Sequence, residues 1–211
     1  MSPKPIHVLI ADDHSVVREG LTSIICREPG FGVVGAFANG MEAVDGYERL
    51  LPDVTIMDLR MPVLGGVEAI GMIRDRHPAA RILVLSNSIG DEDIHLALVA
   101  GAMGYLFKHS SIHQIVPAIH ALMAGDDWIP SEVTDQLTRR DSGGSLTARE
   151  REIVQLLMLG EANKEIGDQL GITEQTVKSH LRNILSKLQV RDRTEAVTVA
   201  LRRGIIHLPE A

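Results

Sequence analysis

The first half of the chain alternates short aliphatic and β-branched runs with longer amphipathic stretches. The short runs are predicted as strands at Ile6–Ala11, Gly32–Phe37, Val54–Met57, Arg81–Ser86 and Gly104–Phe107. The stretches between them have helical spacing, near residues 15–28, 41–51, 66–77, 92–101 and 111–124. Strands that alternate with helices of this length form right-handed βαβ units, which give a parallel sheet with helices on both faces. We therefore predict a flavodoxin-like, doubly wound, five-stranded α/β domain over residues 1–125.

Polar and turn-forming residues replace this pattern between residues 126 and 145. We interpret this segment as a linker, with a short helix near Val133–Leu137 and with Trp128 packed on a domain surface. Residues 146–211 then have helical spacing throughout, with runs at 148–159, 163–170, 174–188 and 193–203. The sequence from Thr147 to Glu150 is a capping box that marks the first of these runs.

Two of these runs, 163–170 and 174–188, flank a short turn that contains glycine, which is the helix-turn-helix pattern. On the second helix, the apolar residues that share one face are Val177, Leu181, Ile184, Leu185 and Leu188. The opposite face carries Gln175, Lys178, Ser179, Arg182 and Ser186. Long donors four residues apart suit the DNA major groove. By this pattern alone, a protein-binding helical bundle fits equally well.

Composition and charge narrow the class of protein. The 211 residues include one cysteine, so no internal disulfide can form, and we expect Cys26 to be a small core residue. No apolar run approaches the roughly 20 residues that a bilayer-spanning helix needs, and the first residues lack the apolar stretch of a signal peptide. We therefore expect a cytoplasmic protein with no membrane partner. The net charge of −7 divides into −5 over residues 1–125, −3 over 126–145 and +1 over 146–211, so charge alone does not predict DNA binding.

Polar side chains end four of the five predicted strands. Asp12 and Asp13 follow the first strand, Asp58 follows the third, Ser86 ends the fourth and Lys108 follows the fifth. Each of these residues alone is more often a helix cap, a turn residue or a solvated side chain. Because ligands of open α/β sheets bind beyond the carboxyl ends of the strands, the whole set favours a functional site.

The chemistry of this set points to a phosphoryl group and a cation. Three converging carboxylates repel one another, and Mg²⁺ with oxygen ligands relieves that repulsion. A carboxylate can act as a nucleophile and take a phosphoryl group. A lysine and a hydroxyl supply a positive charge and a hydrogen bond to the phosphoryl oxygens.

The acidic residues, with Met61-Pro62 after Asp58 and with Lys108, resemble the receiver domain of two-component response regulators over about residues 5–125. The resemblance implies that Asp58 is the phosphoacceptor and that Lys108 pairs with the phosphoryl group. It also implies a Mg²⁺ site formed by Asp13, Asp58, the Arg60 carbonyl and, through water, Asp12.

The same resemblance implies a switch made of Ser86 and Tyr105. Ser86 would move to the phosphate, and the Tyr105 ring would turn inward behind it. An ordinary strand aromatic is the alternative for Tyr105. His109 stands where many receivers have proline, and a ligand role for His109 or for His14 is the less favoured interpretation.

The helical segment contains Leu146–Glu152, Asn163–Ile166, Thr176–His180 and Asn183–Val190, which resemble the LuxR-type effector domain of NarL/FixJ regulators over about residues 146–208. The resemblance implies four helices, the third of which lies in the major groove. The positions of that family that face DNA bases correspond to Lys178, Ser179 and Arg182 in this sequence. Phosphate or helix-positioning sites are matched by Thr176, Asn183 and Lys187.

Two residues of this domain and its last helix raise further points. A buried structural role is an equal alternative for Asn183. Gly167 stands where alanine is usual, at a cost of roughly 0.5–1 kcal/mol in a helix interior. The small apolar residues of the last helix, 193–203, suggest a contact between two copies of the chain bound as a homodimer to double-stranded promoter DNA.

Three functions remain in comparison. The first is a response regulator that takes a phosphoryl group from a histidine kinase on Asp58 and then regulates transcription, with no enzyme activity beyond self-catalysed phosphotransfer and autodephosphorylation. The second is a Mg²⁺-dependent phosphatase, against which Arg60 argues, because a second acid/base carboxylate belongs at that position. The third is a phosphorylation-independent DNA-binding regulator, against which the complete acidic pocket argues.

Overall fold

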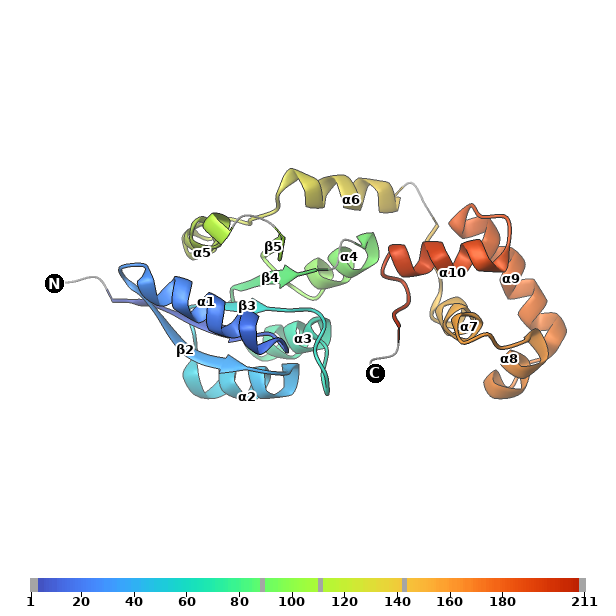
Figure 1. The fold of residues 1–211 in the computed structure, drawn as a ribbon, viewed down its shortest axis with the longest axis horizontal. Coiled ribbons are helices and arrows are strands. Elements are labelled where there is room, and N and C mark those ends of the chain that lie inside the picture. Colours follow the sequence, from blue (N-terminus) through green and yellow to red (C-terminus); the bar gives the residue numbers. More distant parts are fainter. Residues whose placement is uncertain (1–3, 88–89, 110–111, 142–143, 209–211) are drawn as a thin grey trace. The chain divides into compact units, whose positions relative to one another are not determined.

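The computed structural model describes residues 4–87, 90–109, 112–141 and 144–208 of the chain (Figure 1). The chain forms two compact units, and the main break between them falls after Thr134. Each unit has its own hydrophobic core. The elements of the first unit are β1 (Ile6–Ala11), α1 (Ser15–Arg27), β2 (Phe31–Phe37), α2 (Gly40–Leu50), β3 (Val54–Met57), α3 (Gly66–Arg76), β4 (Ile82–Ser86), α4 (Asp91–Val99), β5 (Gly104–Phe107), the 3-10 turn Ile112–Gln114 and α5 (Ile115–Ala124).

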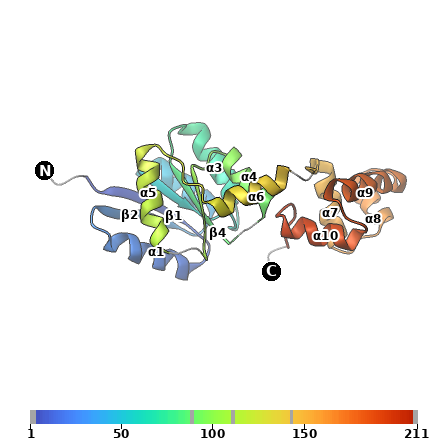
Figure 2. The ribbon, with the colours of Figure 1, turned by 90° about the horizontal axis from the view of Figure 1, so that it is seen from above.

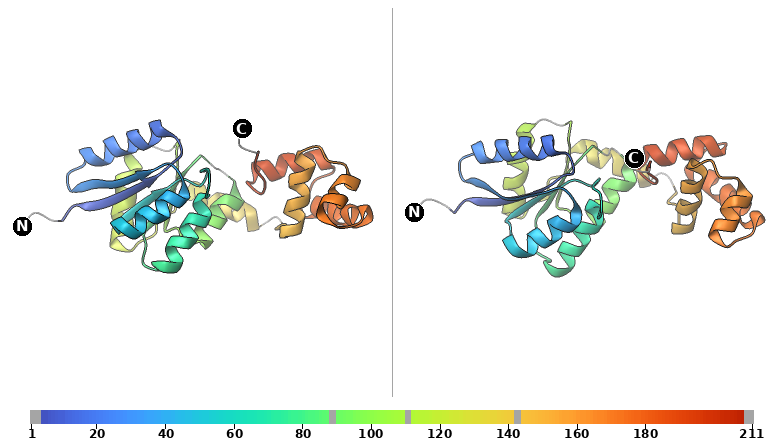
Figure 3. Two further views of the ribbon diagram at one scale, coloured as in Figure 1. Left: turned by 90° about the horizontal axis from the view of Figure 1, so that it is seen from below. Right: turned by 60° about the horizontal axis from the view of Figure 1, so that its bottom comes forward.

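The strands of the first unit form one parallel sheet in the order β2-β1-β3-β4-β5, which confirms the doubly wound prediction. Helices α1 and α2 lie on opposite faces of this sheet (Figure 3). On the face covered by α1 and α5, alternate strand residues such as Val8, Ile10 and Ile56 pack against the two helices. Both faces are therefore covered, as buried parallel strands require.

Two sequence expectations change at this level of detail. Cys26 is exposed on α1 and is not the core residue that we expected. Helix α6 spans Ser131–Asp141, so the predicted linker is helical over more residues than Val133–Leu137.

The segment after α5 adds backbone hydrogen bonds to the free edge of β5. The Trp128 N–H donates to the Met103 carbonyl at 3.0 Å, and the Tyr105 N–H donates to the Trp128 carbonyl at 3.0 Å. Trp128 also packs against the core of the first unit, as predicted for a residue on a domain surface. The chain therefore stays attached to the sheet of the first unit up to the start of α6.

The second unit contains α7 (Ala148–Met158), α8 (Asn163–Leu170), α9 (Glu174–Leu188) and α10 (Arg193–Arg202), which Figure 2 shows in orange to red. These bounds agree with the predicted helical runs to within one residue. On α9, Val177, Ile184 and Leu188 are buried in the core, and Leu181 and Leu185 pack against it. The predicted apolar face of the second helix is therefore confirmed.

The turn between α8 and α9 explains the glycine at position 167. A Cβ atom added to Gly167 would lie 2.7 Å from the Ile172 carbonyl oxygen, which is closer than real Cβ atoms approach backbone. The Ile172 N–H also donates to the Gly167 carbonyl at 2.9 Å. Glycine therefore lowers the helix propensity at position 167, but it leaves the space that the turn needs to lie close to α8.

The capping box at the start of α7 also holds α9. The Thr147 hydroxyl accepts from the Glu150 N–H at 3.3 Å, and the Glu150 carboxylate accepts from the Thr147 N–H at 2.7 Å. The same carboxylate accepts from Lys187 Nζ at 2.6 Å. Burial raises the pKa of Glu150, but the bonds from Lys187 and Thr147 outweigh it and leave that pKa below its usual value.

A first prediction concerns the contact between α3 and the strand that precedes Asp58. A Cβ atom at Gly66 would lie 2.0 Å from the Asp58 carbonyl oxygen, whereas one at Gly71 on the same helix would meet nothing within 4 Å. Gly66→Ala should therefore destabilise the protein by about 1–3 kcal/mol through overpacking. Gly71→Ala should stabilise it by about 0.5–1 kcal/mol, because alanine is the better helix former. Urea unfolding of both variants measures this, and equal effects would contradict the close contact.

A second prediction follows from the lowered pKa of Glu150. The unfolded carboxyl titrates near its ordinary value of 4.5, so its contribution to stability is present above that pH and is lost as the pH falls through the lower folded-state pKa. Glu150→Gln should cost about 1.5 kcal/mol at pH 7, the low end for bonds to charged groups, because Lys187 is partly exposed. The variant should also show a flatter loss of stability in acid. Glu152→Gln, whose carboxylate pairs with Arg149 on the surface, should cost under about 0.5 kcal/mol.

Candidate functional site

The acidic site forms where two neighbouring strands end. Ala11 of β1 and Met57 of β3 are register partners, and the Asp58 N–H donates to the Ala11 carbonyl at 2.8 Å. The next residues, Asp12 and Asp58, are therefore brought side by side. They are 1% and 3% exposed. Two carboxylates buried this closely need a cation between them.

Lys108 supplies that cation from the end of β5, two strands from β3 at the same edge of the sheet. It follows β5, and its N–H donates to the carbonyl of Ser86, the last residue of β4, at 2.9 Å. Its Nζ lies 2.7 Å from Asp12 Oδ2 and 2.6 Å from Asp58 Oδ2. The structure thus brings Asp12, Asp58 and Lys108 into direct contact, with Ser86 fully buried at the adjacent strand end.

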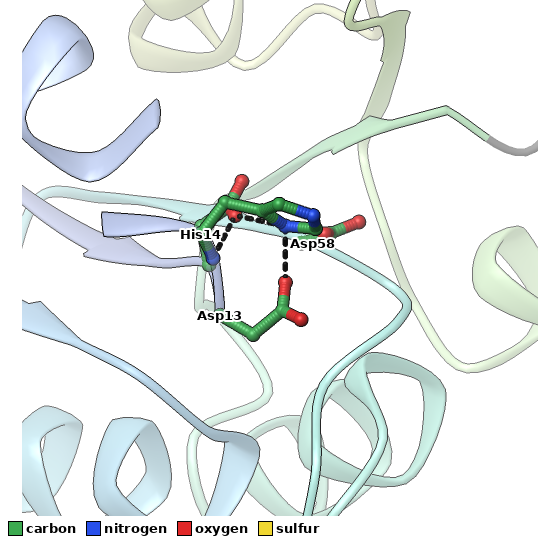
Figure 4. A group of neighbouring side chains, drawn as sticks. Asp13, His14 and Asp58 are labelled. Atoms are coloured by element: carbon green, nitrogen blue, oxygen red, sulfur yellow. Dashed lines mark hydrogen bonds and ion pairs between the residues drawn. The ribbon is translucent and has the colours of Figure 1, made fainter. Parts of the chain in front are cut away.

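Asp13 and His14 form the outer side of the site. His14 Nδ1 lies 2.6 Å from Asp13 Oδ1 (Figure 4). The same nitrogen lies 3.4 Å from Asp12 Oδ1. One ligand atom from each of Asp12, Asp13, His14 and Asp58 falls within a group whose members lie within 4.8 Å of one another. Sequence reasoning set His14 aside, although its place directly after two strand-end aspartates was a signal for it.

The Asp58 carboxylate is oriented by its own loop as well as by Lys108. Asp58 Oδ1 accepts from the Leu59 N–H at 2.7 Å. A hydrogen bond from the Arg60 backbone also acts on this carboxylate and favours its charged form. The loop then turns sharply, with Val63 at φ 69°, before Gly66 packs on the Asp58 backbone. One face of Asp58 is thus occupied by backbone donors.

Burial and charge act in opposite directions on Asp58. Desolvation raises the pKa of its carboxyl, the bond and charge of Lys108 lower it, and the charge of Asp12 raises it again; the net pKa lies above the usual value. Burial lowers the pKa of Lys108, but the two carboxylates outweigh it and raise that pKa. Lys108 therefore stays protonated beside the carboxylates.

The donor set fits a hard divalent cation. Asp12, Asp13 and Asp58 offer carboxylate oxygens, the ligand type that Mg²⁺ prefers. Lys108 is the one basic side chain of the described residues that is paired with both buried carboxylates. One ammonium against three carboxylates leaves the pocket negative, so it retains attraction for a further positive charge.

The two residues predicted as a switch are both buried. Ser86 and Tyr105 each have an exposed fraction of 0%. The Tyr105 ring contacts the Phe107 ring edge-on at 5.5 Å, and Phe107 in turn stacks on His109 at 5.2 Å. The ring of Tyr105 is thus in an inward position in this structure, one strand away from the acidic site.

Helix α9 carries the residues predicted to contact DNA. Its exposed side chains include Lys178, Ser179, Arg182 and Asn183, while Thr176 and Lys187 are half-buried. The exposure of Asn183 shows that the alternative of a buried structural polar group was wrong. Thr176 Oγ1 lies 2.8 Å from Thr173 Oγ1 at the start of the helix.

The cations of α9 differ in their partners. Lys178 Nζ pairs with Glu174 Oε1 at 2.7 Å, one turn earlier on the same exposed face. Lys187 pairs with buried Glu150, which favours its helix-positioning role over a phosphate contact. Within the described ranges of the chain, Arg182 has no hydrogen-bond or ion-pair partner. Its guanidinium is therefore available to a ligand.

Comparison with known proteins covers both units. Residues 8–120 match the response regulator receiver domain family, and residues 144–200 match the luxR family of bacterial regulatory proteins. The chain is 40% identical over 210 residues to the transcriptional regulatory protein LiaR of Bacillus subtilis (strain 168). This match covers 96% of this chain and 100% of LiaR.

Two solved structures are similar to this chain over nearly its whole length. The response regulator ChrA of a heme-sensing two-component system is 35% identical with a TM-score of 0.59, and the match covers 97% of this chain and 100% of ChrA. The response regulator RcsB in complex with DNA is 25% identical with a TM-score of 0.69, and the match covers 94% and 99% of the two chains.

No helix among the described residues is both long enough and apolar enough to cross a membrane. The order of the two folds, the acidic pocket at the strand ends and the extent of these matches agree with one another. The chain belongs to the LuxR-type (NarL/FixJ) family of two-component response regulators, with a receiver domain followed by a DNA-binding helix-turn-helix domain.

Proposed function

We propose that Asp58 accepts a phosphoryl group from a histidine kinase and that this modification controls promoter binding by the second domain. The observation that carries the proposal is the contact of the buried Asp58 carboxylate with Lys108 Nζ at 2.6 Å, beside Asp12. A receiver domain implies a histidine kinase partner, and a LuxR-type domain implies DNA. We assign residues 1–125 to the receiver, 126–145 to a connecting segment that contains α6, and 146–211 to the DNA-binding domain.

The phosphoryl transfer follows from the groups around Asp58. A carboxylate oxygen of Asp58 forms a bond to phosphorus, while the bond from phosphorus to the donor nitrogen of the kinase histidine breaks and its electron pair stays on that nitrogen. Asp58 Oδ1 is already fixed by the Leu59 N–H. Lys108 can turn its ammonium from the carboxylates to the phosphoryl oxygens and stabilise the charge that they carry.

We assign the Mg²⁺ site to Asp13 and Asp58, with Asp12 through water and with the Arg60 carbonyl. When bound there, the ion would neutralise charge on the phosphoryl oxygens and on the three carboxylates. The chain itself supplies the oxygen donors, keeps Asp12 and Asp58 buried and leaves Asp13 a third exposed, at 32% for its side chain.

The same site can return to its resting state by hydrolysis. Attack of water on phosphorus would release inorganic phosphate and leave the Asp58 carboxylate. Arg60 stands two residues after Asp58, where a phosphatase of the kind considered above needs an acid/base carboxylate. We therefore infer self-catalysed phosphotransfer and autodephosphorylation, with no external substrate other than the phosphoryl donor.

The switch that we propose uses Ser86 and Tyr105. A phosphoryl group on Asp58 adds charge and strong acceptors beside the end of β4, where the Ser86 hydroxyl can donate to it. Movement of Ser86 toward the phosphoryl group would favour the inward position that the Tyr105 ring already has in this structure. The Tyr105 N–H donates to the Trp128 carbonyl, so the segment that leads into α6 is bonded directly to the switch residue.

For DNA recognition we propose that α9 lies in the major groove. Lys178, Ser179 and Arg182 would face base edges, and Thr176, Asn183 and Lys187 would contact phosphates or position the helix. One such helix makes few contacts, so two copies bound as a homodimer to a two-fold promoter site would supply the remaining affinity. RcsB, which is similar to this chain, has been solved in complex with DNA.

A third prediction tests the phosphoacceptor. Incubation with acetyl phosphate and Mg²⁺ should label Asp58, as shown by mass spectrometry of its peptide. Asp58→Asn should abolish the label, because an amide is not a nucleophile here. Lys108→Ala should slow labelling about 10²–10³-fold, the effect of losing one preorganised charge at the reacting group.

The control is Asp75→Asn, which removes one exposed carboxylate from α3 and should leave the labelling rate unchanged. A label on another residue in the wild type would refute the assignment of Asp58. If Asp58→Asn bound promoter DNA as tightly as the labelled wild type does, the phosphorylation-independent regulator would be favoured instead.

A fourth prediction tests the groove assignment. Genomic DNA captured by the phosphorylated protein and then sequenced supplies the promoter fragment. Arg182→Ala should weaken binding to this fragment by about 1–3 kcal/mol and relax base preference at one position. Arg202→Ala removes the same charge from α10 and should leave base preference intact. Identical base preferences for the wild type and Arg182→Ala would count against α9 in the groove.

A further inference from the structure

The two adjacent aspartates at the end of β1 pose a geometric problem. Consecutive side chains of an extended strand point to opposite faces, so Asp12 and Asp13 can face one pocket only if the chain turns between them. The Asp12 N–H still donates to Phe37 of the neighbouring strand at 3.1 Å. The His14 N–H already bonds back to Asp12 Oδ1 at 2.9 Å. The turn is therefore confined to Asp13.

Arg18 on the first turns of α1 holds both peptide groups that flank this turn. Its Nη1 donates to the Asp12 carbonyl at 2.6 Å and to the Asp13 carbonyl at 2.9 Å. These carbonyls belong to the peptide planes before and after the Cα atom of Asp13. Fixing both planes fixes φ and ψ of Asp13 and therefore the direction of its Cβ atom.

Asp13 depends on this backbone constraint more than Asp12 and Asp58 do. Those two carboxylates are buried and held by Lys108. The Asp13 side chain is 32% exposed, and within the described residues its carboxylate pairs with His14, which is itself 60% exposed. Water competes for a pair this exposed, so the pair orients the carboxylate weakly.

We propose that Arg18 is a positioning residue that sets the Mg²⁺ affinity of the acidic pocket by fixing the backbone of Asp13. This inference rests on the proposed Mg²⁺ site. Arg18 touches neither the phosphoryl group nor the metal. Its effect is to present the Asp13 carboxylate already turned toward Asp12 and Asp58, so that little ordering remains for the ion to impose.

The experiment measures Mg²⁺ binding to the full-length, unphosphorylated protein by isothermal titration calorimetry. Arg18→Ala should raise the Kd for Mg²⁺ about tenfold, as expected for loss of a group that orients a metal ligand. Arg18→Lys should give an intermediate Kd, because a lysine can still donate to one carbonyl. Arg27→Ala removes the same charge from the exposed end of α1 and should bind like the wild type.

Labelling by acetyl phosphate gives a second readout. The Mg²⁺ concentration for half-maximal labelling of Arg18→Ala should rise by the same factor as the Kd, whereas the rate at saturating Mg²⁺ stays within about two-fold of the wild type. A residue that merely stabilises α1 would instead lower the melting temperature and the saturated rate together, with an unchanged Kd, and that result overturns the proposal. Equal Kd values for Arg18→Ala and Arg27→Ala overturn it as well.

Arg18→Lys carries the same test if the alanine variant does not fold, since its Kd must still lie above that of the wild type. Failure of this inference is distinguishable from failure of the proposed function. If the wild type binds Mg²⁺ with the predicted dependence on Arg18 but is not labelled on Asp58, the phosphoacceptor assignment is wrong and the role of Arg18 stands. If the wild type is labelled on Asp58 but its Mg²⁺ affinity does not depend on Arg18, the phosphoacceptor assignment stands and the role of Arg18 is wrong.

Discussion

The contact of Lys108 with two buried carboxylates is the interaction on which the receiver site depends. Asp12 and Asp58 would repel each other strongly in a low-dielectric environment, and the ammonium at 2.7 and 2.6 Å offsets that repulsion. One positive charge does not balance three acids, so the pocket still attracts a cation. Burial raises the pKa of the Asp58 carboxyl, and the hydrogen bond and charge of Lys108 oppose that rise.

The sheet order makes this contact possible. All strands of the doubly wound sheet end at one edge, and β1 and β3 are neighbours, so Asp12 and Asp58 meet without any special loop. Lys108 starts from β5, with β4 between it and β3, and only a long side chain can reach the acids from there. The backbone N–H of Lys108 donates to the Ser86 carbonyl. The Ser86 hydroxyl that we propose as part of the switch therefore lies at the end of β4, next to Lys108.

These features divide what the sequence can predict from what it cannot. Strand-end residues are predictable, because a parallel sheet brings them to one edge whatever the loops do, and the acidic pocket followed from that rule alone. Arg18 was not predictable, because its partners are backbone carbonyls that leave no mark on the sequence. The sequence indicated only a loss of helix propensity at Gly167, because the close approach of the Ile172 carbonyl to that residue depends on the packing of the turn. The length of α6 was underestimated because the turn-forming residues around it dominated the pattern.

The DNA-binding half obeys a similar balance of charge. Residues 146–211 carry a net charge of only +1, and on α9 Lys178 pairs with Glu174 while Lys187 pairs with Glu150. Each of these pairs must be weakened before its lysine can neutralise a phosphate, so a single copy would have little of the sequence-independent affinity that a strongly basic domain has. Weak binding by one copy would make the occupancy of a promoter sensitive to the association of two copies. Under the proposed function, a receiver whose surface changed on phosphorylation would supply such a control, so a modest DNA-binding face would suit a switched regulator.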